Sequence, residues 1–594
     1  MPLVGRLVPQ NDSTGLAAVS KIFNSFIHGQ DSSIQVQGDS AGPSDVTWLN
    51  EGIKSLQIDT ILPNRGKLDI IKSISLNELE LLFSVDSAYS PPTSSNDATA
   101  SFTLPFNFPV NIVALAQNIT TGFQGQSFAE LIIPKGPSTT DVDARVIHLT
   151  FNNTPFAVFS DKHDVFQQFL AQTTMNANET FSLSGAADTD ADTAVGLLTL
   201  TDIEFSVDTS IAGLQGLNTK PATVANLDVN HGYEDFLLIK VDTTLFNPSN
   251  ITIGTGDVSF GLQFTDATIG SAILNDLVIT PGSGNYSTDV HYSPQGSAVS
   301  AGQRMLENFL QGIDSDTTII GSTDTTPIDS LKPALSEIKL SPVTIPALHQ
   351  NLISGASLSF PTNIVQTGIA QTSFTLANPF TASINILEVA AGVTFQNITL
   401  GSINRVSLSL HADGHSNVTS QTLPFDFNLQ PIVIIDLLTI RSQQKGVDLG
   451  PLPDLFQIVL DNPNAKTNIK TTVDTNKPTC VSGNQFDVDG AILDALEGLE
   501  VNLAIDSSVK LDDFATDLSF NQSSVPATTD DTALYLIGAV APPIVQALVD
   551  QASLTFEEAD ISNISNEGFD LALKGSLTGT GPLDAELIFV DPVT

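Results

Sequence analysis

The sequence is poor in cysteine and in basic residues, and both shortages exclude classes of protein. Cys480 is the single cysteine among 594 residues, so no disulfide can form within the chain, and CxxC redox or zinc chemistry is excluded. The chain has 22 Lys and Arg against 65 Asp and Glu, a formal charge of −43. Nucleic acids and anionic lipid surfaces both attract clustered Lys and Arg, so we expect neither as a partner.

Tyrosine and tryptophan are also scarce, with 5 Tyr and 1 Trp against 33 Phe. Because Phe has no polar atom, this balance indicates aromatics that fill cores and not recognition surfaces. Apolar residues make up 41% of the chain and the mean hydropathy is +0.14, which argues against an acidic disordered chain.

Long apolar runs are missing as well. The first seven residues lead straight into Gln10-Asn11-Asp12 without the apolar core of a signal peptide. The longest apolar run, 432–440, contains Asp436 and is far shorter than the ~20 residues of a membrane helix. We therefore expect the chain as given to be soluble, with any membrane anchor outside it.

What the sequence has in abundance is strand alternation. Apolar and polar residues alternate over 203–207, 258–264 and 425–429, and turns rich in Ser, Thr, Asp, Gly and Pro separate such runs. A period of two means that one face is buried and the other is wet, which is typical of antiparallel sheets. The predicted fold class is mostly β.

Helices are few and short. Apolar stripes at helical spacing predict helices over 19–27, 165–170 and 305–310, and Ser300 with Gln303 forms a capping-box pattern before the third. A fourth helix is predicted to open at Pro542-Pro543, with proline in its first turn. Each helix has one apolar stripe, so each should pack on a sheet.

The first three helices belong to an internal repeat. Phe26, Phe169 and Phe309 are separated by 143 and 140 residues. In each copy there follow a glycine, a mixed segment, a Pro-interrupted strand start and a strand that ends at a Gly turn. The glycines are Gly38, Gly185 and Gly321. This order predicts units that resemble one another in structure.

The repeat predicts five segments, close to the roughly four domains that the length suggests. They are repeat unit 1 at 14–160, repeat unit 2 at 161–299, repeat unit 3 at 300–430, an irregular fourth unit at 431–540 and a truncated start of a further unit at 541–594. The last block has Gly581-Pro582 where others have Asn-Pro and stops at Thr594. We therefore expect a fragment with an unpaired sheet edge.

Two Asn-Pro blocks carry a resemblance to a known domain. Leu245-Phe246-Asn247-Pro248 precedes 258–264 and Ile269-Gly270, and Leu376-Ala377-Asn378-Pro379 precedes 393–395 and Leu400-Gly401. Both resemble the late-embryogenesis-abundant type 2 (water-stress) domain, which implies a fibronectin-like β-sandwich of ~100 residues. The implied fold is an elongated array of tandem antiparallel sandwiches, each with one short helix.

Tandem copies with an intervening helix are similar to a fungal family of unknown function. The resemblance covers most of 14–430 and part of 540–594, and implies a vacuolar or other endomembrane protein with an N-terminal membrane helix. The chain departs from it in lacking that helix and in having Asn107-Phe108-Pro109 in the first copy. The resemblance supplies no catalytic residue. The Asn-Pro pairs themselves are interpreted as strand punctuation.

Three patterns could carry chemistry. Gly38-Asp39-Ser40-Ala41-Gly42 matches a nucleophile elbow, but a half-polar strand precedes it and Pro43 follows it. Asp188, Asp190 and Asp192 alternate as in a calcium loop, but the Gly and Glu that such a loop needs are missing, which favours a solvated loop. His411 and His415 are four apart, but Gly414 between them favours a loop over a metal-binding helix face.

We therefore predict no catalytic, cofactor-binding or metal-binding residue, and no esterase activity from Ser40. Ten N-x-S/T sequons, together with the acidic surface, indicate a glycoprotein in a lumenal setting. They begin at Asn11, Asn118, Asn152, Asn178, Asn250, Asn285, Asn397, Asn417, Asn521 and Asn563.

The predicted function is that of a non-enzymatic structural or interaction protein, the lumenal sandwich array of a fungal endomembrane (vacuolar) protein. The alternative is a lipid-binding or lipid-transfer protein with an apolar groove along its repeats. Phe260, Leu262 and Phe264 discriminate between the two, because they either pack shut or line a channel. The partner is an unidentified protein or lipid, and the membrane anchor is expected outside this chain.

Overall fold

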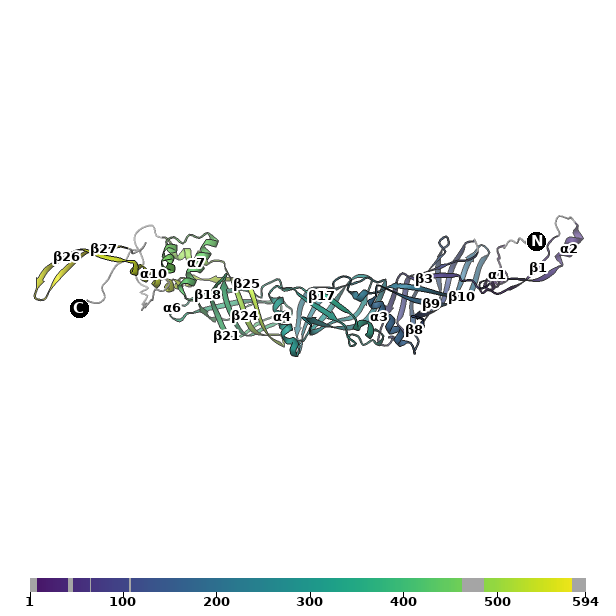
Figure 1. The fold of residues 1–594 in the computed structure, drawn as a ribbon, viewed down its shortest axis with the longest axis horizontal. Coiled ribbons are helices and arrows are strands. Elements are labelled where there is room, and N and C mark those ends of the chain that lie inside the picture. The colour runs from purple at the N-terminus through teal and green to yellow at the C-terminus, as the bar shows by residue number, and fades with distance from the viewer. Residues whose placement is uncertain (1–7, 41–45, 65, 106–107, 462–485, 579–594) are drawn as a thin grey trace. The chain divides into compact units, whose positions relative to one another are not determined.

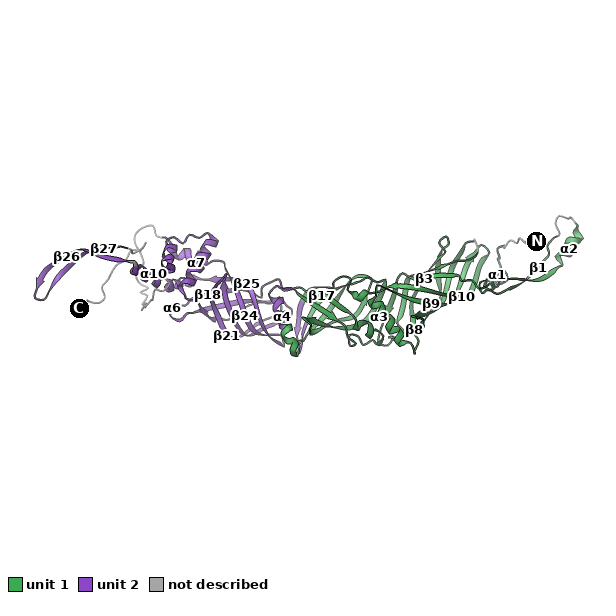
Figure 2. Ribbon diagram, viewed as in Figure 1, with its two compact units in different colours: residues 1–227, 239–302, 315–346 green, residues 228–238, 303–314, 347–594 purple. Residues whose placement is uncertain are grey.

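The computed structural model describes residues 8–40, 46–64, 66–105, 108–461 and 486–578. Cys480, Asn107 and the predicted Gly581-Pro582 strand start lie outside the described residues. Strands dominate (Figure 1), and the contacts divide the chain into two compact units (Figure 2). Unit 1 is 1–227, 239–302 and 315–346, and unit 2 is 228–238, 303–314 and 347–594.

Most strands of unit 1 belong to one fifteen-stranded sheet. They are β3 (Ile71–Leu76), β4 (Leu79–Leu82), β5 (Pro92–Phe102), β6 (Val110–Phe123), β7 (Gln126–Asp141), β8 (Val146–Val158), β9 (Asn178–Thr193), β10 (Gly196–Ala212), β11 (Thr223–Gly232), β12 (Leu237–Asn247), β13 (Ile251–Phe264), β14 (Ala267–Ile279), β15 (Gly282–Tyr292), β16 (Ser315–Ile320) and β17 (Lys339–Ile345). Its helices are α1 (Ser13–Ile27), α2 (Thr47–Lys54), α3 (His163–Met175) and α5 (Lys332–Ser336), with single turns η1 (Gln215–Leu217), η2 (Gly296–Ala298) and η3 (Asp329–Leu331).

The first part of this sheet curls into a barrel-like arrangement, called here the α3 barrel. Its strand order is β10-β9-β6-β7-β8-β5-β3. The strands β3 and β10 lie side by side at its seam, where the Thr209 hydroxyl donates to the Ile74 carbonyl at 2.7 Å. The apolar stripe of α3, including Phe166 and Phe169, is buried against the inside, because its members recur at helical spacing.

The second part of the sheet forms a closed ring. Strand β13 pairs with both β14 and β16, which closes the order β13-β14-β15-β12-β11-β17-β16. Strand β4 joins the two parts, since it pairs with β5 on one side and runs parallel to β13 on the other. Residues 228–238, at the turn between β11 and β12, belong to unit 2.

Helix α1 protects an exposed backbone edge. Ser20, Asn24 and His28 lie one helical turn apart and meet the backbone of β10 at Thr199 and Thr201. The Asn24 amide, for example, donates to the Thr199 carbonyl at 3.1 Å and accepts from the Thr201 N–H at 2.9 Å. Covering a free strand edge in this way blocks unwanted strand pairing.

Unit 2 contains an eight-stranded sheet that closes on itself, called here the unit 2 barrel. Its ring order is β18-β25-β24-β20-β21-β23-β19, and β19 returns to pair with β18. The strands are β18 (Ile353–Ser359), β19 (Ile369–Ala377), β20 (Ile384–Phe395), β21 (Ile398–Ala412), β22 (Asn417–Thr419), β23 (Leu423–Phe427), β24 (Leu499–Leu511) and β25 (Phe514–Thr529). The helices are α4 (Val299–Leu310), α6 (Ile364–Thr367), α7 (Pro431–Lys445), α8 (Leu452–Asp461), α9 (Val488–Leu496) and α10 (Ile537–Gln551), with η4 (Asp531–Leu536) before the last.

Two hairpins stand apart from these sheets. Strands β1 (Ser32–Gln37) and β2 (Gln57–Leu62) pair only with each other, as do β26 (Ser553–Ser565) and β27 (Gly568–Thr578), among the described strands. One face of the second hairpin is apolar, because Phe556 pairs with Gly575, Ala559 with Leu573 and Ile561 with Leu571. Its large apolar side chains are about half exposed.

The expectation of mostly β structure is confirmed, and the sheets are closed and barrel-like. The finer expectation of tandem sandwiches and the five-unit division stay predictions. Two predicted helix starts are wrong. Helix α4 begins at Val299, directly after η2, so Ser300 lies inside it and is not its cap. Helix α10 begins at Ile537, which places Pro542 and Pro543 inside it.

Candidate functional site

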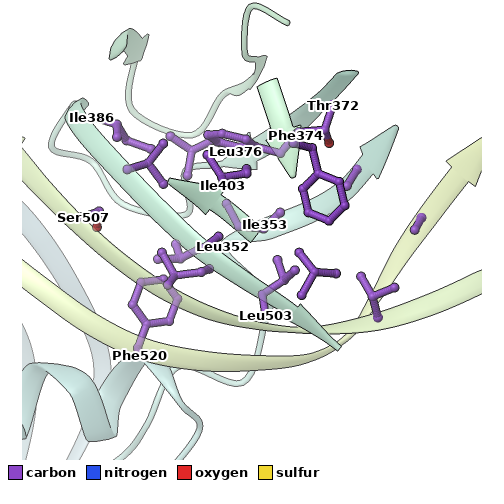
Figure 3. A pocket seen from close by; sticks show the side chains of 18 of the residues that line it. Leu352, Ile353, Thr372, Phe374, Leu376, Ile386, Ile403, Leu503, Ser507 and Phe520 are labelled. Carbon is purple, nitrogen blue, oxygen red and sulfur yellow. The ribbon is translucent and has the colours of Figure 1, made fainter. Parts of the chain in front are cut away.

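A cavity lies inside the unit 2 barrel (Figure 3). Its volume is about 160 Å³. All seven strands of the ring contribute to its wall, and its lining holds no Asp, Glu, Lys, Arg or His. Labelled side chains in Figure 3 include Leu352, Ile353, Thr372, Phe374, Leu376, Ile386, Ile403, Leu503, Ser507 and Phe520.

The alternation of β24 explains one wall of this cavity. Every second residue from Leu499 to Leu511 faces inward and lines the cavity, and the residues between them face outward. Six of these seven inward residues are Leu, Val or Ile, and the remaining one is Ser507. Antiparallel pairing with β20 and β25 holds this stripe in register.

Helices close the two ends of the barrel (Figure 1). Leu306, Phe309 and Leu310 of α4 line the cavity at one end, and the Phe309 ring lies 6.2 Å from the ring of Phe380. At the other end the lining includes Leu437 of α7, Leu496 of α9 and Leu536 of η4, all of them buried. The cavity is therefore covered by apolar helix faces at both ends.

Five polar side chains lie in the lining, and four of them are hydrogen-bonded. These four are Ser357, Thr372, Thr528 and Thr529, with partners at 2.7 to 3.5 Å. Ser507 is 5% exposed, and among the described residues nothing donates to its hydroxyl or accepts from it. In Figure 3 its oxygen lies on the opposite side of the view from that of Thr372.

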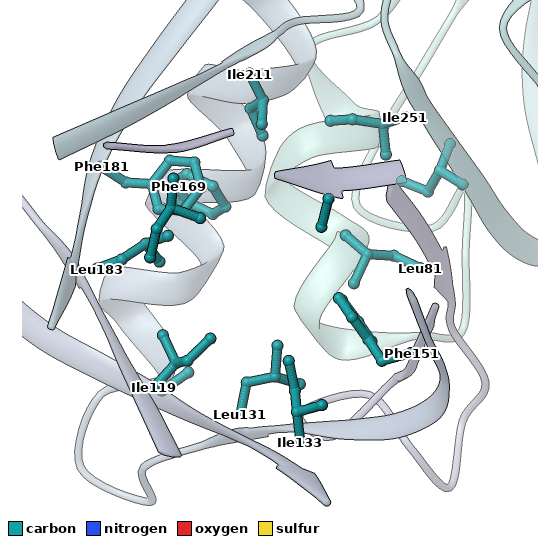
Figure 4. Close-up of a cluster of buried hydrophobic side chains, with 14 of the residues drawn as sticks. Leu81, Ile119, Leu131, Ile133, Phe151, Phe169, Phe181, Leu183, Ile211 and Ile251 are labelled. Carbon is teal, nitrogen blue, oxygen red and sulfur yellow. The ribbon is translucent and has the colours of Figure 1, made fainter. Parts of the chain in front are cut away.

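The α3 barrel of unit 1 is packed more fully (Figure 4). Its cavity is about 70 Å³, and five residues of α3 line it. Phe169 is the centre of an aromatic cluster, with ring centroids of Phe123, Phe128 and Phe181 each 5.4 Å away. Figure 4 shows Phe169 and Phe181 adjacent on the helix side, with Ile119, Leu131 and Ile133 across the space.

The residues chosen from the sequence to discriminate groove from core behave as core. Phe260, Leu262 and Phe264 lie in β13 and are buried, and none of them lines either cavity. The sequence signal for the cavity was missed because the inward stripe of β24 has the pattern of any strand buried on one face.

The Asn-Pro sites act at turns, as predicted, and the asparagines are buried. Asn247 accepts from the Ser249 N–H and donates to the Ile251 carbonyl, both at 2.8 Å. Asn378 accepts from the Phe380 N–H at 3.0 Å and donates to the Ala382 carbonyl at 2.8 Å. One hydrogen-bonding scheme therefore holds both strand-to-strand turns.

The repeat glycines share a close backbone approach. A side chain at Gly38, Gly185 or Gly321 would come within 2.1, 1.9 or 1.8 Å of a carbonyl oxygen. Only glycine fits at such a distance. Ser40 is exposed, and among the described residues no histidine or carboxylate hydrogen-bonds to it.

The acidic and histidine patterns do not form metal sites in the described part of the chain. The interpretation of 188–192 as a loop is wrong, because these residues lie within β9, where the aspartates face outward between buried Thr189 and Ala191. Asp190 pairs with Lys135 at 2.6 Å. His411 contacts Asn385 and Asp413, whereas His415 contacts Thr381, so the two imidazoles have separate partners.

A hydrogen-bonded cluster around the Asp512 carboxylate anchors 228–238 within unit 2. Asp512, at the β24–β25 turn, accepts from the Ser383 hydroxyl at 2.7 Å, the Ser383 N–H at 3.0 Å, the Gly232 N–H at 3.1 Å and His231 Nδ1 at 2.8 Å. Burial alone would raise the pKa of Asp512, but the hydrogen bonds from Ser383 and Gly232 and the nearby His231 bring it below its usual value.

One segment missed in the sequence is apolar enough for a membrane helix by length and composition. It is Asp531–Leu548, of which 39% is buried within the structure. Leu536 in this segment lines the cavity, and Val540 and Ile544 are buried, so it also serves as a packed helix of unit 2. Pro542-Pro543 and small residues interrupt its apolar residues, so the segment does not stand out in the sequence as a long apolar run.

Comparison with known proteins reaches only part of the chain. Residues 138–262 match a family model described as a protein of unknown function, DUF3712. No curated protein matches the chain. The matched residues run from β7 into β13 and include α3 and Asn247. Of the cavity lining in unit 2, Val229 and Leu237 lie within the match.

Proposed function

We propose that the unit 2 barrel binds an apolar ligand of the lipid class in its interior. The observation that carries this proposal is a cavity of about 160 Å³ whose wall is hydrocarbon and whose ends are covered by helices. An engineered cavity of about 150 Å³ lined by Leu, Ile and Phe binds benzene, so this volume suffices for a small apolar molecule or part of a larger one.

The energetics favour occupation by an apolar molecule. Side chains around a void lack contact partners on one side, and a guest restores these contacts. Each methylene group moved from water into such a site gains about 0.8 kcal/mol. The charge of −43 on the chain does not oppose an uncharged guest, since its attraction to the wall is not electrostatic.

A second candidate is the structural or interaction role expected from the sequence, without enzymatic activity. The exposed apolar face of β26–β27 supports it, because such faces on small hairpins usually contact another surface. The tandem sandwich array, the fungal endomembrane (vacuolar) setting, the lumenal side and the anchor outside this chain belong to this proposal. Nine of the ten sequon asparagines are exposed, which supports the glycoprotein part, whereas Asn250 is half-buried and hydrogen-bonded.

Native mass spectrometry with lipid extraction tests the ligand proposal on the purified full chain. The wild type is expected to carry an apolar adduct that organic solvent releases. Ala391→Leu fills the cavity, because Ala391 lines it, and is expected to lose the adduct. Ala390→Leu is the matched control, because Ala390 is paired with outward-facing Asp506 and lies outside the lining. A wild type that neither carries an adduct nor takes up added benzene contradicts the proposal.

A further inference from the structure

Ser507 is the exception on the inner wall of the unit 2 barrel. Its neighbours on the same face of β24, Ile505 and Val509, are aliphatic and line the cavity too. The residue is 5% exposed, and no described residue pairs with its hydroxyl. A valine at this position would complete the apolar wall, whereas serine places a hydroxyl without a partner there.

We infer that Ser507 is the polar anchor of the bound ligand, an inference that rests on the proposed function. The ligand class is an uncharged apolar molecule with a single hydrogen-bonding oxygen, such as a hydroxyl or carbonyl group. A hydroxyl can both donate and accept, so Ser507 fits either kind of oxygen. The other polar side chains in the lining already have partners, which leaves Ser507 as the group with free capacity.

Charged ligands are disfavoured by the same wall. The lining contains no cationic side chain to pair with a carboxylate or phosphate and no anionic one to pair with an amine. Burying an unpaired charge is far costlier than burying a hydroxyl. The charged end of a fatty acid would therefore not be held at Ser507.

Toluene, phenol and benzoate test the inference, because they differ at one substituent. Binding to the full chain is measured by calorimetry at pH 7, with wild type, Ser507→Ala and Ser508→Ala. Ser508 is the matched control, since it faces outward and donates to Asp517 at 2.6 Å. We expect wild type to bind toluene and phenol but not benzoate. Ser507→Ala should weaken phenol about tenfold, the loss of one hydrogen bond, and leave toluene unchanged.

The outcomes separate this inference from the proposed function. If the wild type binds neither toluene nor phenol, the proposed function fails. If toluene binds and Ser507→Ala leaves phenol affinity unchanged, the cavity is real but Ser507 is not the anchor. Benzoate binding as tight as that of phenol would refute the uncharged class. The melting temperature of unliganded Ser507→Ala should equal or exceed that of wild type, whereas a structural hydroxyl would lower it on removal.

Discussion

The α3 barrel of unit 1 and the unit 2 barrel are made of the same kinds of parts, a curled sheet and an apolar helix against its interior, although helices cover both ends of the unit 2 barrel. They differ in how deeply the helix enters. Five residues of α3 line the 70 Å³ cavity of the first, whereas three residues of α4 line the 160 Å³ cavity of the second. The aromatic rings of the first contact one another around Phe169, and Phe374 and Phe520 of the second face the void.

The comparison shows that the protection of the backbone edges and the packing of the interior are separate properties of a barrel. The pairing of β18 with β19 removes the free backbone edges of the unit 2 barrel, whereas helix α1 covers the free edge of β10 in the α3 barrel. Whether the inside becomes core or binding site depends on the side chains and on the covering helix, because interiors otherwise pack to near-crystalline density. A barrel of this kind can therefore be structural in one unit and hollow in the next.

Removing an aromatic ring should affect the packed barrel most. Phe169→Ala is expected to destabilise unit 1 by about 3–5 kcal/mol, because its ring contacts three others and leaves a large void. Phe374→Ala should cost unit 2 less, about 2–3 kcal/mol, since that ring already borders empty space. Urea unfolding of the full chain measures both, and equal losses would contradict the contrast between the barrels.

Replacing the asparagine of the Asn-Pro turn should lower the free energy of unfolding by a similar amount in each unit. Asn247→Ala and Asn378→Ala each leave a buried N–H and a buried carbonyl without their side-chain partner, so each is expected to cost about 2 kcal/mol. Asn397→Ala, at an exposed turn, is the control and should change stability by less than about 0.5 kcal/mol. A large difference between the two sites in denaturant unfolding would show that their shared geometry does not carry shared energetics.

Enlarging a small residue should have different effects in the two barrels. Ala98 lines the small cavity and Ala391 the large one. Ala98→Leu is expected to destabilise unit 1 by about 1–3 kcal/mol through overpacking. Ala391→Leu should cost less than about 1 kcal/mol, because the added atoms occupy space that is already empty. Thermal unfolding with and without added toluene checks this, and a comparable loss at both sites would refute the hollow interior.

Much of the fold could be predicted from residue patterns, because period-two alternation is local. The strands around 203–207 and 258–264 lie in β10 and β13, and the helices over 19–27 and 165–170 are α1 and α3. Helix starts depend on packing that the local pattern does not contain. The sequence predicts Pro542 in a first helical turn, but the apolar segment before it extends the helix because it packs into unit 2. The alternating aspartates of 188–192 predict a loop, whereas they lie in β9, where Asp190 pairs with Lys135 of another strand.

The candidate site could not be predicted in the same way. Its cavity depends on the combined side-chain volumes of seven strands and several helices, and on which strands meet after the ring closes. No local sequence pattern contains this information on combined volume and strand pairing. Ser507 could have been noticed as the one polar residue at an inward position of 499–511, but a single serine in a strand is common and becomes informative only beside a void.

The smallest expected effect is the loss of stability in acid that comes from the Asp512 cluster of the unit 2 barrel. The pKa of Asp512 lies below its usual value in the folded chain, so its carboxylate stabilises unit 2 above that usual value. This contribution is lost as the pH falls through the lowered pKa, because protonation then weakens the hydrogen bonds from Ser383, Gly232 and His231. Neutral and alkaline solutions leave it intact.

Asp512→Asn mimics the protonated state and isolates this contribution. At pH 7 it should destabilise unit 2 by about 1 kcal/mol, since charged acceptors make stronger hydrogen bonds than amides do. As the pH falls through the lowered pKa of Asp512, the difference from wild type should vanish, because the wild-type carboxyl then becomes neutral as well. Asp513→Asn, at the exposed neighbour, should show no such convergence. Urea midpoints at the two pH values decide the matter. If the gap between Asp512→Asn and wild type stays constant down to pH 2, the cluster holds 228–238 through shape and not through charge, and the two barrels then differ in packing alone.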